Sequence, residues 1–155
     1  MSASGISVVF FDLGDTLGTA VMSATSPARL EAFNAFPFVP DLLQRLRDRE
    51  LHLGIISNTG IEHGTAVDKV LLHAGIRKHF QRKLRIYSAD VGLMKDTPQI
   101  FQLAAERAGF ATQPDRCLFV GENAAERANA QAAGMSVCAD PQQVEPLLAT
   151  GENRH

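Results

Sequence analysis

The feature that most constrains the fold of this chain is an alternation of short apolar runs with longer amphipathic segments. The first run, Ile6–Phe11, is rich in β-branched and aromatic residues, which is typical of a strand buried on both faces. Further strands are predicted at 51–58, 83–89, 116–122 and 136–139. Helices are predicted at 40–51, 65–76, 97–110 and 123–135, with a closing turn or helix at 141–150. This alternation predicts an α/β fold, a three-layer, Rossmann-like parallel sheet with helices on both faces.

Local signals refine this outline. Residues 13–35 contain Gly, Ser, Thr and Pro without a clear period, so we expect a loop or a small excursion there. The 83–89 strand is less apolar than the others, which favours the edge of the sheet. Thr97 is expected to cap the 97–110 helix, with Pro98 at its first position, and Gly75 fits the C-terminal cap of the preceding helix.

Length and composition narrow the class of protein. A chain of 155 residues suits one globular domain, 1–155, that buries a full core without disulfides. With a formal net charge of −2, the basic run 77–85 is expected to be a solvated face rather than a nucleic-acid site. No segment approaches the ~18 apolar residues that a membrane helix needs. Cys117 and Cys138 lie in apolar runs without CxxC spacing, which predicts buried thiols in a reducing, cytoplasmic compartment.

Polar residues with catalytic potential follow the ends of the predicted strands. Asp12 follows the first strand, Ser57 and Asn58 end the second, and Glu122 ends the fourth. In parallel α/β sheets ligands bind beyond the carboxyl ends of the strands, so these groups should converge. Lys95 lies in the loop before the 97–110 helix. A carboxylate nucleophile, a lysine and a second carboxylate suit attack on a phosphoryl group with a divalent metal, because the cations neutralise the charge on the transferred group.

The same segments resemble the four motifs of the haloacid dehalogenase (HAD)-like superfamily. "FFDLGDTL" is similar to the first motif and "LGIISN" to the second. "GLMKDTPQIFQLAAERAG" is similar to the third, and "CLFVGENAAERANAQAAGM" to the fourth. The resemblance extends from Ile6 to Met135. It implies a HAD-like core and a magnesium-dependent phosphate-ester hydrolase that works through an aspartyl-phosphate.

The resemblance also implies a role for each matching residue. Asp12 would be the nucleophile and a ligand of Mg²⁺, and Lys95 would neutralise the phosphate. Gly14, through its backbone carbonyl, and Glu122 would complete the protein ligands of the metal. The implied phosphate-binding residues are Thr16, Ser57 and Asn58. Because Mg²⁺ prefers oxygen ligands and keeps several waters, two carboxylates and one carbonyl are a normal share for the protein.

The spacing of the motifs bears on the substrate. Family members often insert a cap domain between the first and second motifs or between the second and third. Here 45 positions separate Asp12 from Ser57 and 38 separate Ser57 from Lys95, too few for a cap of the usual size. The chain therefore resembles the capless type, whose open site favours a bulky or macromolecular phosphorylated substrate, or a homo-oligomer in which a neighbouring subunit serves as lid.

The sequence departs from the family pattern at three places. Phosphatases of the family usually carry, two residues after the nucleophile, an Asp that protonates the leaving group, and here that position is Gly14. The next residue, Asp15, either reaches the site by a different path as the catalytic acid or holds the loop in a local turn. Glu122 replaces the usual Asp. Glu126 and Arg127 occupy the two positions where a second acid normally falls, and Glu126 is either a metal-shell residue or part of an Asn123-x-x-Glu126 capping box.

These departures leave a second hypothesis open, a catalytically impaired HAD-like binding or regulatory module. Retention of Asp12, Thr16, Ser57 and Lys95 favours the enzyme, because a module without activity would lose the nucleophile and the lysine as readily as other residues. Dehalogenase activity is a third hypothesis and is less favoured, since dehalogenases of this family generally carry a cap over a small apolar substrate.

Overall fold

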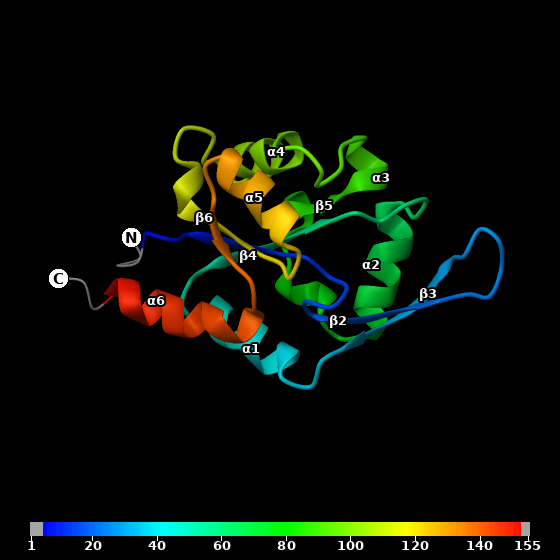
Figure 1. Ribbon diagram of the computed structural model, residues 1–155. Helices are drawn as coiled ribbons and strands as arrows, with labels where there is room; N and C mark the ends of the chain where they lie inside the picture. The colour runs from blue at the N-terminus through cyan, green and yellow to red at the C-terminus, as the bar shows by residue number, and fades with distance from the viewer. Residues whose placement is uncertain (1–4, 153–155) are drawn as a thin grey trace.

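A five-stranded parallel sheet forms the centre of the computed structural model, which describes residues 5–152 (Figure 1). Its strands are β1 (Val8–Phe11), β4 (His52–Ser57), β5 (Arg85–Tyr87), β6 (Cys117–Val120) and β7 (Ser136–Cys138). They lie in the order β5-β4-β1-β6-β7, with every neighbouring pair parallel. β5 is at an edge, as its less apolar sequence predicts.

Helices cover both faces of the sheet. One face packs against α1 (Val39–Asp48), α2 (Gly64–His73) and α6 (Val144–Glu152), and the other against α4 (Gln99–Arg107) and α5 (Ala124–Ala132). Shorter helical turns are α3 (Ser88–Val91), η1 (Arg77–His79), η2 (Arg82–Leu84), η3 (Pro114–Arg116) and η4 (Pro141–Gln143). None of the helices within 5–152 is long and apolar enough to cross a membrane.

Alternating side chains of β1 divide the core between the two faces. Val9 and Phe11 belong to the cluster formed with α1, α2 and α6, whereas Val8 and Phe10 belong to the cluster formed with α4. All four are buried, because successive side chains of a strand point to opposite faces and both faces are covered. The predicted three-layer, Rossmann-like architecture is confirmed.

Of the two expectations for residues 13–35, a loop or a small excursion, the structure shows the excursion, and it has regular secondary structure. This segment contains an antiparallel hairpin of β2 (Gly18–Met22) and β3 (Leu30–Ala35), which projects from the body of the molecule in Figure 1. A side chain at Gly18 would collide with the backbone carbonyl of Asn34, so glycine permits the two strands to pair there. Most hairpin residues are exposed and Phe33 is buried, so the sequence lacks the apolar run by which buried strands are found.

The helix ends agree in part with the sequence signals. Gly75 follows the end of α2 with a φ of +78°, in the left-handed conformation expected of a C-terminal cap. α4 begins at Gln99 with Pro98 in the N-cap position, so the predicted Thr97 cap is wrong. Pro98, with its φ of −67°, already has a near-helical backbone and becomes the boundary residue itself.

No cap domain separates the motif-bearing strands in the described part of the chain. Between β1 and β4 the chain forms the β2–β3 hairpin and α1, and between β4 and β5 it forms α2, η1 and η2. The spacing of the motifs predicts this capless arrangement.

Candidate active site

The sheet brings the predicted residues to one edge. In register, Phe11 pairs with Ile55 on one side and Val120 on the other, so Asp12 follows β1 between the ends of β4 and β6. The chain adds β4 and β5 on one side of β1 and then β6 and β7 on the opposite side. This reversal of strand order beside β1 is the place where α/β sheets bind ligands.

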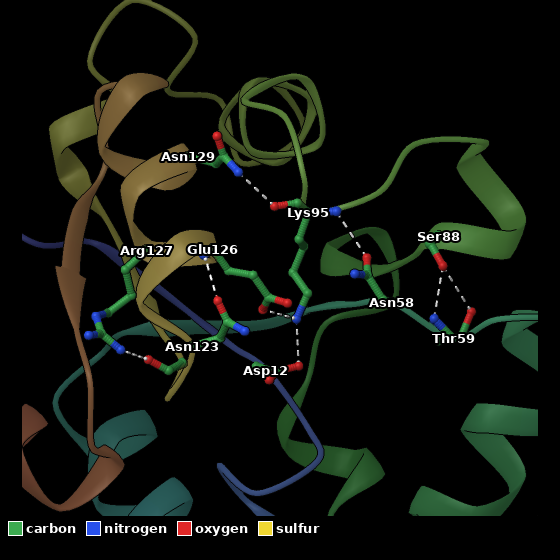
Figure 2. A network of polar contacts seen from close by, with 10 residues as sticks. Asp12, Asn58, Thr59, Ser88, Lys95, Asn123, Glu126, Arg127 and Asn129 are labelled. Atoms are coloured by element: carbon green, nitrogen blue, oxygen red, sulfur yellow. Dashed lines mark hydrogen bonds and ion pairs between the residues drawn. The ribbon is translucent and has the colours of Figure 1, made fainter.

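Lys95 connects the ends of these strands (Figure 2). Its Nζ lies 2.7 Å from Asp12 Oδ1 and 2.8 Å from Glu126 Oε1, and the residue is only 2% exposed. The backbone of Lys95 is held as well. Its amide donates to Asn58 Oδ1 at 2.9 Å, and its carbonyl accepts from Asn129 Nδ2 at 3.0 Å. Lys95 is therefore held beside Asp12 by contacts from three parts of the fold: the loop after β1, the loop after β4, and α5.

Glu126 has both a capped backbone and a side chain directed at the site. Asn123 Oδ1 accepts a hydrogen bond from the Glu126 amide at 3.0 Å, which makes Asn123 the N-cap of α5. The Glu126 carboxylate points toward Lys95 in Figure 2, and the contact is an ion pair that lacks hydrogen-bond geometry. The sequence gives no signal for this pair, although Glu126 stands at a position where a second acid of the family normally falls.

Arg127 stabilises the backbone at the end of β6. Its Nη1 donates to the carbonyl of Gly121 at 2.8 Å, and the Gly121 amide donates to the carbonyl of Cys138 at 3.0 Å. A side chain at position 121 would lie 2.9 Å from the Phe119 ring, so the residue after β6 must be small. Arg127 thus stabilises the backbone at a position where members of the family normally carry an acidic residue.

The residues expected to bind phosphate differ in exposure. Thr16 and Ser57 are buried, at 1% and 6% exposure, whereas Asn58 is exposed while its side chain holds the Lys95 amide. Within the described residues, Thr16 Oγ1 is buried without a hydrogen-bond partner. Since buried hydroxyl groups are nearly always bonded, this atom is suited to a bound ligand.

The loop after Asp12 turns tightly and exposes Asp15. Gly14 forms an isolated bridge with Gly18, and the Asp15 amide donates to the Gly18 carbonyl at 2.8 Å. Asp15 has a φ of +62°, a conformation that Asp adopts more readily than most residues. Of its two interpretations, the exposed side chain and the turn geometry favour a residue that shapes the loop.

The oxygen donors at this edge are compatible with Mg²⁺. The Asp12 carboxylate and the Gly14 carbonyl are adjacent to the end of β1, and Glu122 lies one residue beyond Gly121, which follows the neighbouring strand β6. Glu122 is exposed, and the described residues contain no group of three acidic, His or Cys side chains that could hold a metal alone. Because Mg²⁺ commonly uses one or two carboxylates with waters and substrate phosphate, this donor set is sufficient.

The two cysteines are buried, as predicted. Burial raises the pKa of the Cys117 thiol to about 12 and also raises the pKa of Cys138. A thiol with a raised pKa is a poor nucleophile at neutral pH, so the burial of the cysteines favours a structural part for both.

The chain is similar in sequence to known hydrolases. Residues 26–134 match the family model of haloacid dehalogenase-like hydrolases. The chain is 32% identical over 103 residues to an (S)-2-haloacid dehalogenase of Pseudomonas sp. (strain YL), covering 66% of this chain and 41% of that protein. It is 35% identical over 107 residues to the pyrophosphatase PpaX of Oceanobacillus iheyensis, covering 66% of this chain and 47% of that protein.

The fold as a whole is similar to that of a solved structure. An uncharacterized protein from Listeria monocytogenes serotype 4b superposes with a TM-score of 0.78 at 16% identity, covering 95% of this chain and 99% of that one. The chain thus spans less than half the length of the curated relatives that it matches, but nearly all of this structural neighbour. With the family model matched over most of its length and the strand-end residues brought together, the chain belongs to the haloacid dehalogenase-like hydrolase family.

Proposed function

We propose that this protein is a magnesium-dependent phosphate-ester hydrolase that uses Asp12 as its nucleophile. The observation that carries the proposal is the buried Lys95 ammonium, 2.7 Å from Asp12 Oδ1 at the carboxyl edge of the sheet. Burying a lysine is costly unless its charge is paired, so a fold that retains it beside a carboxylate favours a role for the pair. The same ammonium group would stabilise the negative charge on an oxygen of a bound phosphoryl group.

The chemistry proceeds in two displacements. Asp12 attacks phosphorus through the carboxylate oxygen that Lys95 does not hold, and the bond from phosphorus to the ester oxygen breaks. The alkoxide or phenoxide leaves and takes a proton from water. Water then attacks the phosphorus of the aspartyl-phosphate, releasing inorganic phosphate and restoring the carboxylate.

The charge of the site supports a divalent cation. Asp12, Lys95 and Glu126 carry formal charges of −1, +1 and −1, so the cluster is negative where an anionic phosphate would bind. Mg²⁺ held by Asp12, the Gly14 carbonyl and Glu122 would offset this repulsion and stabilise negative charge on the transferred group.

The test measures turnover and metal binding together. Hydrolysis of 4-nitrophenyl phosphate is followed with Mg²⁺ and with EDTA, and Mg²⁺ binding is titrated by calorimetry. We expect Asp12→Asn to abolish turnover and Glu122→Gln to weaken Mg²⁺ binding at least about tenfold. Glu106→Gln, at an exposed carboxylate of α4, is the matched control and should change neither.

Two results would contradict the proposal. Undiminished turnover in Asp12→Asn would remove the nucleophile from the mechanism. Failure of the unaltered protein to hydrolyse any phosphate ester, with Mg²⁺ present, would favour the alternative of a HAD-like binding or regulatory module.

Dehalogenation is a second candidate, favoured by the similarity to the (S)-2-haloacid dehalogenase and by Gly14. A halide ion leaves carbon without a proton, so displacement by Asp12 would need no acid at position 14. Release of chloride from (S)-2-chloropropionate in the presence of EDTA, lost in Asp12→Asn, would establish this reaction in place of phosphate-ester hydrolysis.

A further inference from the structure

The β2–β3 hairpin covers a cavity that opens beside the candidate active site. The cavity has a volume of about 340 Å³ and is lined by four parts of the chain. Leu13 and Gly14 come from the loop after Asp12, and Ser57 and Asn58 come from the end of β4. The same residues thus border both the predicted phosphate position and the cavity, which makes the two spaces contiguous.

The far wall of the cavity is apolar. The hairpin contributes Met22, Leu30 and Phe33, and α2 contributes Val67 and Leu71. A mainly apolar lining with a few polar groups at one end is typical of small-molecule sites, and the volume lies at the lower end of their range of about 300–1,000 Å³. The space suits an aromatic ring or a short branched chain rather than a macromolecule.

An ion pair joins the hairpin to the loop between β4 and α2. Arg29 Nε lies 2.6 Å from Glu62 Oε1, and Glu62, which also lines the cavity, is only 4% exposed. Arg29 precedes β3, and Glu62 lies in the loop between β4 and α2. The hairpin is thus held to the body of the protein at the cavity, in the manner of a lid.

We infer that this cavity receives the apolar body of a small phosphate monoester whose phosphate lies at Asp12 and Lys95. The inference rests on the proposed function and narrows it to esters of apolar alcohols or phenols. It also replaces the expected macromolecular substrate, because the hairpin supplies within the chain the enclosure that a cap domain supplies elsewhere.

The test uses binding, so that it does not depend on turnover. Phenylphosphonate and methylphosphonate are not hydrolysed and differ only in the apolar group. Their dissociation constants are measured by calorimetry with Mg²⁺ present. We expect phenylphosphonate to bind at least about tenfold more tightly, because burying a ring contributes enough for such a ratio.

A matched pair of variants locates the site. Ala20→Trp would fill the cavity from β2, whereas Thr19→Trp adds the same bulk at the neighbouring exposed position, which the cavity does not include. We expect Ala20→Trp to abolish the preference for phenylphosphonate while methylphosphonate still binds, which also shows that the variant is folded. Thr19→Trp should keep the preference.

The outcomes separate this inference from the proposed function. Equal binding of the two phosphonates, or a preference that survives in Ala20→Trp, would overturn the cavity assignment and leave the hydrolase intact. Binding of neither phosphonate would overturn both. Conversion of a dimer to a monomer by Ala20→Trp alone would assign the cavity to a second copy of the chain and overturn the inference.

Discussion

Position 14, where phosphatases of the family usually carry the catalytic acid, is a glycine in this chain, and an aspartate follows one residue later, at Asp15. This arrangement affects which leaving groups Asp12 can displace. Gly14 lines the cavity beside the candidate site, while Asp15 is exposed and shapes the turn. A Cβ built at Gly14 meets no heavy atom within 4 Å, and Gly14 is not among the residues with positive φ. The position therefore has open space around a Cβ and a backbone conformation that residues other than glycine adopt.

Because position 14 has open space, introducing an aspartate there tests whether the site lacks a catalytic acid. General acid catalysis contributes about 10²–10⁴-fold, and poor leaving groups depend on it most. We expect Gly14→Asp to raise the turnover of alkyl phosphates toward that range while aryl phosphates change much less. Steady-state kinetics on both classes of ester would measure it.

Asp15→Asn is the control, because Asn also tolerates a positive φ and removes only the charge. It should leave alkyl turnover unchanged. An inert Gly14→Asp together with an inactive Asp15→Asn would identify Asp15 as the acid instead.

At the scale of elements, the C-terminal helix α6 is anchored in two ways. Val144 and Leu148 are buried in the cluster that contains the apolar face of α1. On the surface, the Arg45 guanidinium donates three hydrogen bonds to the Glu145 carboxylate, and this interaction lowers the pKa of Glu145. Exposed ion pairs contribute little to stability, so the buried leucine should dominate the attachment.

We therefore expect Leu148→Ala to lower the free energy of unfolding by about 2–5 kcal/mol, the usual cost of such a truncation in a core. The adjacent Leu147, which is 36% exposed, offers a matched control whose change to Ala should stay within about 0.5 kcal/mol. Urea unfolding followed by circular dichroism would compare them. Equal losses would mean that α6 is not docked as described.

The sheet and the site differ in how far the sequence predicts them. The five parallel strands are found from the sequence, because strands covered on both faces need continuous apolar residues and leave a recognisable pattern. The two strands of the hairpin leave no such pattern, since Phe33 is the one residue of β3 that is buried outright and exposed strands are held by pairing with each other.

The same difference holds for the site. The motifs predict that Asp12 and Lys95 belong to the site, but their 2.7 Å contact depends on loops that Asn58 and Asn129 hold in place. For Glu126 the sequence leaves two interpretations, a metal-shell residue or part of a capping box, and neither includes a partner such as Lys95 from another segment. Contacts between distant segments require the register of the sheet, which local patterns do not contain.

At the scale of the whole molecule, stability should depend on pH through His79. This residue lies in η1, is 4% exposed, and accepts a hydrogen bond at Nδ1 from Arg47 Nη1 of α1 at 3.3 Å. Burial lowers its pKa, and the positive charges of Arg47 and Lys78 lower it further. The folded protein therefore keeps His79 neutral at a pH where the unfolded chain binds a proton.

A lowered pKa in the folded state means that the stabilising contribution is present above the unfolded pKa and is lost as pH falls. We expect the free energy of unfolding to decrease below about pH 6.5, by at most about 1.4 kcal/mol per pH unit from this group. His79→Gln keeps an acceptor for Arg47 and should flatten the profile between about pH 6.5 and 5.5. The same change at the exposed His73 should leave the profile as it is.

Chemical denaturation at a series of pH values would measure both variants. A slope that persists unchanged in His79→Gln would assign the pH dependence to other groups.

The four contacts that hold Lys95 affect the motions of the segment that carries it. Residues 92–98 form a connection without regular strand or helix, and Met94 and Asp96 beside the lysine are exposed. Connections of this kind usually open locally at little cost. Here, opening would break the contacts of Lys95 with Asn58, Asn129, Asp12 and Glu126 at once and would leave the buried Asp12 carboxylate without its ammonium partner. The connection should therefore open only when the whole domain unfolds, with the slow fluctuations of a core strand rather than those of a surface loop.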